Sequence, residues 1–128
     1  MFLIEVYLDR SPIEGIGVFT KRAIAKGELI WKFDPLIDRH IPVSFYEAQD
    51  GPLKTFLDRY CYPSRDDPNY IVYEGDDSRY MNHSDDPNCD ISDEKAMYAV
   101  RDIGAREELT CDYGIFFNGG GFEMLGER

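Results

Sequence analysis

Short runs of β-branched and aromatic residues alternate with turn-forming residues along the first third of the chain. These runs predict strands at residues 2–8, 18–20 and 29–33. The third run ends at Asp34-Pro35, a pair that favours a turn. Residues 36–42 are ambiguous and allow one more short strand. The pattern therefore indicates a chain that is rich in β structure from its start.

The pattern changes over residues 43–62, where we predict a helical insertion. Ser44, with Glu47 three positions later, matches a capping box. Apolar residues then recur at roughly helical spacing, and a Gly-Pro pair divides the stretch. We therefore expect two short helices, at about 44–50 and 52–60.

Strand patterns return in the second half of the chain, at 70–73 and 96–100. Residues 107–114 end in a strand-like segment, and the tail at 115–128 is aromatic and glycine-rich. The regular alternation of strands and helices that is typical of a parallel sheet is absent. We therefore predict a mostly β fold with a small helical part, in one domain over residues 1–128.

Two short polar or glycine-rich stretches stand out between the predicted strands. Asn82-His83-Ser84 suits neither a strand nor a helix interior, because these side chains compete with the backbone for hydrogen bonds. The stretch is either a solvated turn or a place where polar groups converge on a ligand. Gly15-Ile16-Gly17 permits a sharp turn and a close approach to a ligand, although a plain tight turn explains it equally well.

The net charge limits the kinds of partner. The chain has 14 basic and 25 acidic residues, so its net charge is 14 − 25 = −11. Binding to phosphates needs a basic surface, so we expect no direct contact with nucleic acid. The charge suits a basic protein or peptide that contains lysine, although acidic side chains also serve solubility alone.

The cysteines and the N-terminal segment bear on the compartment. Cys61, Cys89 and Cys111 are odd in number and widely spaced, which argues against a disulfide framework and a structural zinc site. Reduced thiols suit a cytosol-like compartment, such as the bacterial cytoplasm or a nucleus or host cell. The first residues lack the basic leader of a signal peptide, and no apolar run reaches the roughly 18 residues of a membrane span.

Three stretches, taken in their order along the chain, resemble a known family. They are Gly15-Ile16-Gly17-Val18-Phe19, then Arg79-Tyr80-Met81-Asn82-His83-Ser84 continuing to Asn88-Cys89, and then Glu107-Glu108-Leu109-Thr110-Cys111-Asp112-Tyr113-Gly114. Each motif is modest alone, but the ordered set closely resembles the SET-domain family of protein-lysine methyltransferases. The resemblance spans roughly residues 3–117, and the size is similar to that of the minimal stand-alone viral and bacterial members.

The resemblance implies a β-clip fold of small curved sheets with a C-terminal pseudoknot, and S-adenosyl-L-methionine as the methyl donor. It also implies a narrow channel through which a lysine of the substrate reaches the donor. By matching position, Tyr113 is the expected catalytic residue. The expected cofactor-binding residues are Gly15, Ile16, Gly17, Arg79, Asn82, His83, Phe116 and Phe117. The expected channel residues are Tyr73, Cys111 and Tyr113.

The chain also departs from the family pattern. Asp85 stands where larger members have a zinc-binding cysteine, so we expect no metal. Either the aromatic tail or a partner closes the channel, or the site stays open. Cys111 replaces the Phe or Tyr of many relatives, and its small side chain predicts that methylation proceeds beyond one methyl group. Ile16 replaces an aromatic residue, which predicts weaker stacking on the cofactor.

Other interpretations of the same residues stay open. Tyr113 could be an ordinary core tyrosine with a satisfied hydroxyl, and Phe116 and Phe117 could be core residues. The whole chain could be a non-catalytic SET-like module that binds proteins, or a methyltransferase that acts on a group other than lysine. A monomer and a homodimer are both compatible with the sequence.

Overall fold

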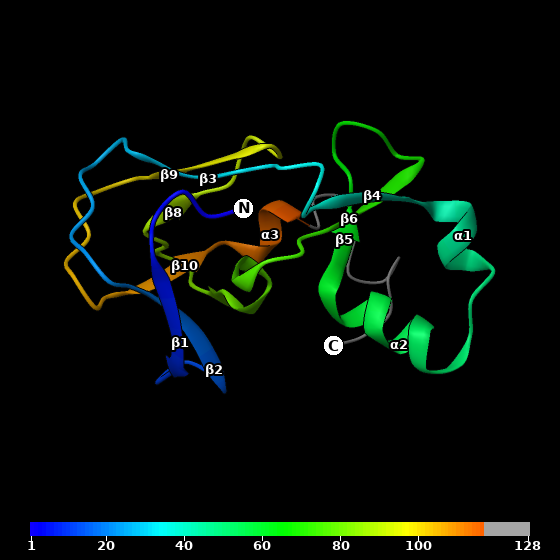
Figure 1. The fold of residues 1–128 in the computed structure, drawn as a ribbon, viewed down its shortest axis with the longest axis horizontal. Helices are drawn as coiled ribbons and strands as arrows, with labels where there is room; N and C mark the ends of the chain where they lie inside the picture. Colours follow the sequence, from blue (N-terminus) through cyan, green and yellow to red (C-terminus); the bar gives the residue numbers. More distant parts are fainter. Residues whose placement is uncertain (117–128) are drawn as a thin grey trace.

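The computed structural model describes residues 1–116, and in this part of the chain short strands predominate (Figure 1). The strands are β1 (Val6–Arg10), β2 (Ile16–Thr20), β3 (Leu29–Lys32), β4 (Arg39–Pro42), β5 (Cys61–Pro63), β6 (Tyr70–Tyr73), β7 (Asn82–His83), β8 (Cys89–Asp90), β9 (Ala96–Ala99) and β10 (Glu108–Cys111). The helices are α1 (Val43–Glu47), α2 (Gly51–Tyr60), the 3-10 helix η1 (Asp77–Tyr80) and α3 (Tyr113–Phe116). This composition confirms the predicted mostly β fold with a short helical insertion.

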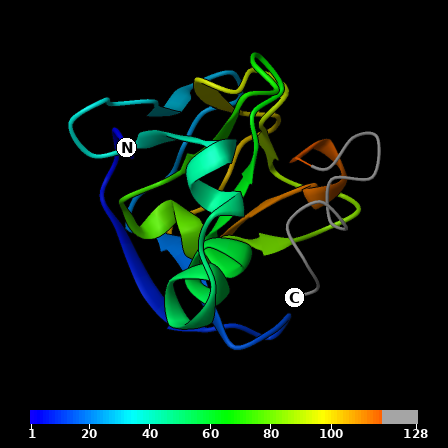
Figure 2. The same ribbon diagram turned by 90° about the vertical axis from the view of Figure 1, so that its right-hand side faces the viewer.

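The strands form three small sheets. Their orders are β1-β2-β10-β7, β3-β9-β8 and β4-β6-β5. All neighbouring strands are antiparallel except β10 and β7, which pair in parallel. Figures 1 and 2 show β4-β6-β5 together with α1 and α2 at one end of the molecule, the other two sheets at the opposite end, and α3 between them.

Each end of the molecule has its own hydrophobic core. The core under the first two sheets includes Ile30, Met97 and Leu109, and the core between α1, α2 and the third sheet includes Leu57 and Val72. Tyr113 and Phe116 of α3 pack against both cores. The short helix α3 therefore joins the two ends of the molecule.

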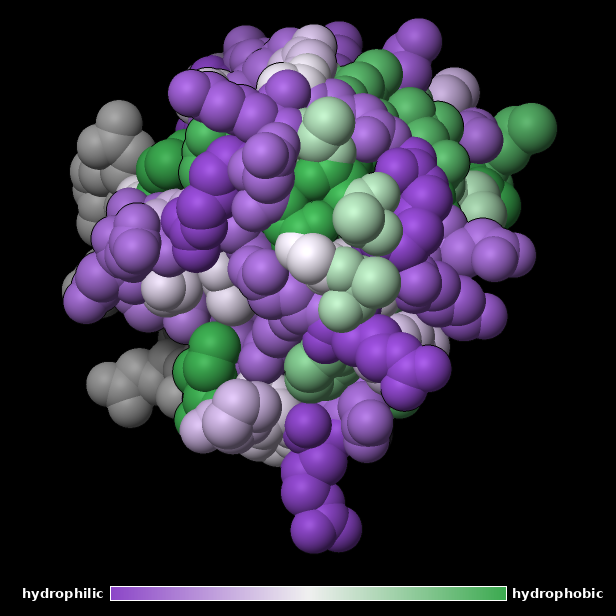
Figure 3. Space-filling model, turned by 90° about the vertical axis from the view of Figure 1, so that its left-hand side faces the viewer, coloured by the Kyte–Doolittle hydropathy of each residue, from purple (hydrophilic) through white to green (hydrophobic). Residues whose placement is uncertain are grey.

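Figure 3 shows the outer face of the end that contains β1, β2, β3 and β9. This face is mainly hydrophilic, with scattered hydrophobic side chains. None of the helices within residues 1–116 has the length and apolar character that crossing a membrane requires.

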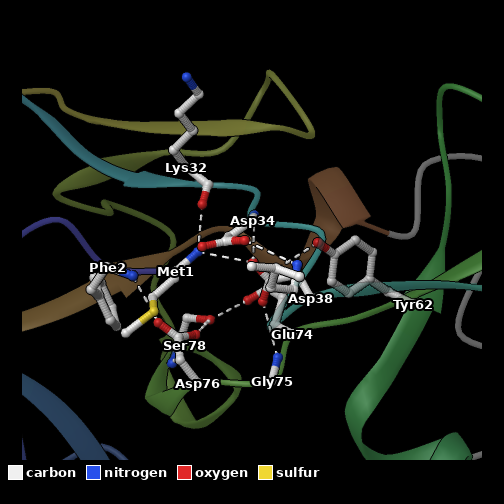
Figure 4. Close-up of polar contacts among 11 residues, drawn as sticks. Met1, Phe2, Lys32, Asp34, Asp38, Tyr62, Glu74, Gly75, Asp76 and Ser78 are labelled. Atoms are coloured by element: carbon white, nitrogen blue, oxygen red, sulfur yellow. Dashed lines mark hydrogen bonds and ion pairs between the residues drawn. The ribbon is translucent and has the colours of Figure 1, made fainter.

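The buried carboxylate of Asp38 connects three separate segments of the chain at the junction between the two ends (Figure 4). Asp38 is fully buried and accepts hydrogen bonds from the Asp34 N–H at 2.9 Å and the Gly75 N–H at 3.0 Å, and it pairs with the Met1 ammonium at 2.9 Å. A Cβ atom on Gly75 would lie 2.0 Å from the carbonyl oxygen of Ile37. Glycine at 75 therefore lets the segments before β4 and after β6 lie directly against each other.

The predicted strand at 2–8 is shifted in the structure. β1 runs from Val6 to Arg10, and Phe2 makes only an isolated bridge with Trp31. The strand continues to Arg10 because Asp9 and Arg10 pair with the start of β2. The predicted strands within 18–20, 29–33, 70–73 and 96–100 are confirmed, and the ambiguous segment 36–42 contains β4.

The two predicted helices are confirmed, but the capping box is wrong. Helix α1 begins at Val43 after Pro42, and no side chain caps it. Ser44 lies inside the first turn, because β4 runs directly into the helix and the Val43 N–H bonds to the Asn69 carbonyl oxygen at 2.9 Å.

The expectation that Asn82-His83-Ser84 is unsuited to a strand is also wrong. Asn82 and His83 form β7, which pairs in parallel with Thr110 and Cys111 of β10. The Ser84 N–H then donates to the Cys111 carbonyl oxygen at 3.0 Å. Because long-range pairing satisfies the backbone groups, the local preference of these side chains is overridden.

Candidate active site

The Asn82 side chain holds the turn between β1 and β2. Its Nδ2 atom lies 3.0 Å from the Glu14 carbonyl oxygen, 3.2 Å from the Ile16 carbonyl oxygen and 3.0 Å from Glu108 Oε2. Asn82 is 9% exposed, so these contacts lie in a protected environment where unmet hydrogen bonds are costly. We call residues 14–17, held in this way, the glycine loop.

A side chain would be sterically unfavourable at both glycine positions of this loop. Gly15 has φ of +48°, a backbone conformation that side chains disfavour. A Cβ atom on Gly17 would lie 2.3 Å from Glu108 Oε2 and 3.1 Å from the Cβ of Ser11. The Ser11 hydroxyl also donates to Glu108, at 2.9 Å. The close approach that the two glycines allow is thus to the Glu108 carboxylate within the protein.

His83 connects this region to the expected catalytic tyrosine. Its Nδ1 accepts a hydrogen bond from the Tyr113 N–H at 3.0 Å, so Nε2 carries the proton of the neutral ring and lies 2.8 Å from Asp85 Oδ1. The imidazole is 40% exposed. The Tyr113 hydroxyl in turn donates to the Met81 carbonyl oxygen. The segments that carry Asn82 and Tyr113 therefore lie side by side, as the resemblance implies.

A partly open pocket of about 50 Å³ lies between the two ends of the molecule, and we call it the aromatic cavity. Tyr113 and Cys111, two of the three expected channel residues, line it together with Phe116. The Phe116 ring packs on Tyr62 with 4.2 Å between ring centroids. The other lining residues are Trp31, Arg59, Tyr60, Tyr62, Arg65, Glu74, Ser78, Arg79, Met81, Ile91, Asp93, Glu94, Ala96 and Met97.

Tyr73, the third expected channel residue, does not line this cavity. Its hydroxyl lies 2.8 Å from Arg79 Nη1. The Arg79 guanidinium lies 5.1 Å from the ring centroids of both Tyr60 and Tyr80, where cation–π attraction operates. Arg79, which lines the cavity, therefore separates Tyr73 from it. Its Nε atom is buried and has no hydrogen-bond partner among the described residues.

Other expected residues lie apart from the cavity. Ile16 is 53% exposed and, with Gly15, borders a surface hollow beside β1. Phe117 lies outside the described residues, so its expected role at the cofactor stays a prediction. Within residues 1–116, no group of His, Cys, Asp or Glu side chains is arranged to hold a metal ion.

Sequence reasoning missed three residues of this region: Glu108, Tyr62 and Glu74. Glu108 lies inside the third motif, but nothing in the local sequence links it to Gly17, which it approaches only in the folded structure. Tyr62 and Glu74 belong to no motif, and only the fold brings them together, with the Tyr62 hydroxyl 2.5 Å from Glu74 Oε2.

Burial dominates the electrostatics of the cavity. It raises the pKa of Glu74, and burial together with the Glu74 charge raises the pKa of the Tyr62 hydroxyl well above its usual range. The same two causes raise the pKa of the Cys111 thiol well above its usual range. Cys61, Cys89 and Cys111 are all buried, and the Cys111 side chain acts as a small apolar group.

Comparisons with known proteins identify the family of the chain. The family model described as "SET domain" matches residues 15–114. Human histone-lysine N-methyltransferase 2B is 31% identical over 118 residues, which cover 81% of this chain and 4% of that protein. The Saccharomyces cerevisiae histone-lysine N-methyltransferase described as H3 lysine-4 specific is 32% identical over 119 residues, covering 84% of this chain and 11% of that protein.

A solved structure of the Chaetomium thermophilum Polycomb Repressive Complex 2, a humanized mutant bound to the inhibitor GSK126, is also similar. It has a TM-score of 0.66 and 25% identity, and the match covers 91% of this chain and 16% of that one. The chain spans only a small part of the length of the curated relatives it matches. The family model covers most of the chain, from the glycine loop to Tyr113, and the chain belongs to the SET-domain family.

Proposed function

We propose that the chain transfers a methyl group from S-adenosyl-L-methionine to a lysine side chain of a basic protein, a histone or a histone-like protein. One observation carries this proposal: Tyr113 lines an aromatic cavity and belongs to a segment joined through His83 and Asn82 to the glycine loop. This arrangement puts an acceptor-side residue and a donor-side loop on two adjacent segments.

The residues at the glycine loop fit the proposed cofactor. Asn82 and Glu108 fix the backbone of the loop, and the surface hollow beside Gly15 and Ile16 is lined by polar as well as apolar groups. The buried N–H groups Trp31 Nε1 and Arg79 Nε have no hydrogen-bond partner among the described residues. A bound ligand with acceptor atoms near the cavity could satisfy them. S-adenosyl-L-methionine would supply an electrophilic methyl group on a sulfonium.

Tyr113 is suited to orient an amine. Its hydroxyl donates to the Met81 carbonyl oxygen, and this hydrogen bond fixes the direction of the hydroxyl group. A lysine nitrogen in the cavity could donate to this oxygen and keep its own lone pair directed at the methyl group. Orientation of this kind and exclusion of water supply much of the acceleration in such a displacement.

The substrate class follows from charge and from the relatives. Related proteins are described as acting on histones, one of them on H3 lysine-4. The net charge of −11 would attract a basic tail of this type. Such a substrate, and the odd number of widely spaced cysteines, both suit a cytosol-like or nuclear compartment.

The test is methyl transfer from radiolabelled S-adenosyl-L-methionine to histones and to a cell lysate. We expect Tyr113→Phe to lower kcat by at least about 100-fold while the affinity for the donor, measured by calorimetry, stays unchanged. The matched control is Tyr98→Phe on β9, where the side chain is 41% exposed and does not line the cavity. Full activity of Tyr113→Phe would contradict the assignment.

The alternative of a binding module gives a different result. Such a protein would have the same fold and bind histone peptides, but it would not transfer methyl groups. Donor binding without any labelled product, in histones or lysate, would favour that alternative.

Cys111 leads to a prediction about the product. Its small side chain leaves room at the cavity, so wild type is expected to add more than one methyl group. Cys111→Tyr would fill this space and restrict the product to monomethyl-lysine. Mass spectrometry of exhaustively treated peptide checks this, and only monomethyl product from wild type would contradict it.

A further inference from the structure

Three carboxylates are buried within residues 1–116: Asp38, Glu74 and Glu94. Asp38 pairs with the Met1 ammonium at 2.9 Å, and Glu94 Oε2 lies 3.7 Å from His40 Nε2. None of the ion pairs of this part of the chain includes Glu74. A buried carboxylate without a cation is costly, so it indicates a ligand or a functional role.

Glu74 lies at the aromatic cavity, close to the expected acceptor residues. It follows β6 directly and lines the cavity together with Cys111 and Tyr113. Figure 4 shows its carboxylate between Tyr62 and Ser78, which contact it with their hydroxyls at 2.5 and 2.6 Å. Each carboxylate oxygen thus accepts one hydrogen bond and has a further acceptor site available.

We propose that Glu74 receives the ammonium group of the substrate lysine and accepts its proton before methyl transfer. This inference rests on the proposed function. The reason is chemical: a lysine in solution has a pKa near ~10.4 and is almost fully protonated at neutral pH, so it has no lone pair with which to attack. The aromatic cavity contains a carboxylate that can both bind this cation and remove its proton.

The atoms balance without any further reagent. The lysine –NH₃⁺ and the Glu74 –COO⁻ become –NH₂ and –COOH. The nitrogen lone pair then forms a bond to the donor methyl carbon, the C–S bond breaks, and its electron pair goes to sulfur. The product is a methylammonium, and the Glu74 proton leaves to solvent before the next turnover. Because burial raises the pKa of Glu74, its carboxylate is a better base than a solvated one.

Titratable groups face Glu74 from each element around it. Tyr62 comes from β5, Asp76 from the N-cap of η1, Asp38 from the loop before β4, and Cys111 from β10. Asp76 and Asp38 add negative charge, whereas the Tyr62 and Ser78 hydroxyls stabilise the ionised form. The pH at which activity falls on the acidic side of the profile, its acidic limb, is therefore set by this group of residues together. Glu74 is the member that would contact the lysine.

The first experiment measures kcat/KM against pH with a histone H3 N-terminal peptide, for wild type and Glu74→Gln. We expect the variant to lose about 100-fold at pH 7 and to recover steadily toward high pH, where the amine deprotonates in solution. Glu74→Asp should recover part of the loss. A peptide with aminoethylcysteine in place of the target lysine, whose amine is more acidic, should be affected less by Glu74→Gln.

Glu94→Gln is the matched control, because it removes another buried carboxylate that lines the same cavity but already has a partner. It should keep the wild-type position of the pH profile. An identical shift in both variants, or an unshifted profile in Glu74→Gln, would overturn the inference. If Glu74→Gln does not fold, Ser78→Ala tests the same idea, since loss of that hydroxyl should move the acidic limb to higher pH.

Peptide binding without turnover separates this inference from the proposed function. At pH 7, calorimetry should show at least tenfold weaker binding of the same peptide to Glu74→Gln than to wild type, and a smaller difference at pH 10. Equal binding at both pH values would overturn the inference whatever the activity. Glu74-dependent binding with no methyl transfer by wild type would instead overturn the proposed function and keep Glu74 as the ammonium-binding group.

Discussion

The glycine loop and the aromatic cavity are built in different ways, although they belong to one proposed site. The loop depends on a few polar contacts from one side chain, Asn82, and on the absence of side chains at Gly15 and Gly17. The cavity depends on rings from several elements, such as Tyr62 and Phe116, which meet only after folding. A short motif can encode a fixed backbone conformation, whereas a cavity needs residues from many separate segments of the chain.

This difference predicts different responses to substitution. A change in the loop should alter donor binding sharply, because there are few contacts and each is required. A change in the cavity should alter substrate chemistry and pH dependence more than it alters the loop. Three variants test this comparison, from the largest expected loss of stability to the smallest.

Asn82→Ala should have the largest effect. It leaves the Glu14 and Ile16 carbonyl oxygens and Glu108 without their shared donor, at a cost of about 3 kcal/mol in the free energy of unfolding. Urea denaturation measures this loss, and calorimetry should show weaker donor binding in the same variant. Asn82→Asp is a useful companion, since it keeps the size but removes the N–H donors. A loss of less than about 0.5 kcal/mol in both variants would contradict the role of Asn82 in the loop.

Gly17→Ala should cost about 2 kcal/mol, because the new Cβ would overlap Glu108 and has to displace it. The Glu108 contact to Asn82 would be disturbed as well, so donor binding should weaken while the pH profile set at the cavity stays unchanged. The control is Gly104→Ala, where the nearest atom to an added Cβ is Glu107 Oε1 at 3.8 Å. Equal losses for the two alanine variants would remove the steric explanation.

The smallest effect concerns the pH dependence of stability at the cavity. The pKa of Glu74 is raised by burial, so the folded state holds this proton more tightly than the unfolded state. The stabilisation is therefore fully present below the ordinary pKa of 4.5 and is lost as pH rises through the folded value. Glu74→Gln should flatten the decline of the unfolding free energy above that pH. Parallel wild-type and variant curves in urea denaturation between pH 4 and 8 would show that Glu74 has no such linkage.

Much of the fold and half of the site could be predicted from the chain. Strands such as Leu29–Lys32 and Tyr70–Tyr73 have strong local patterns, and the motif around Asn82 and His83 has a recognisable order. The strand β7 could not be predicted, because its residues are poor strand formers and pairing with Cys111 decides their conformation. The capping box at Ser44 failed for a related reason: β4 enters helix α1 without a turn.

Local motifs in the sequence are enough to indicate the SET-domain family, the glycine loop and the candidate residue Tyr113, because the residues of each motif are close together in the chain. The role of Glu108 in fixing the loop, and the position of Tyr73 behind Arg79 and outside the cavity, are visible only in the folded structure. The folded structure also brings Glu74 beside Tyr62, and none of the ion pairs within residues 1–116 includes Glu74. Burial and charge pairing depend on which distant segments meet, and a local pattern does not contain that information.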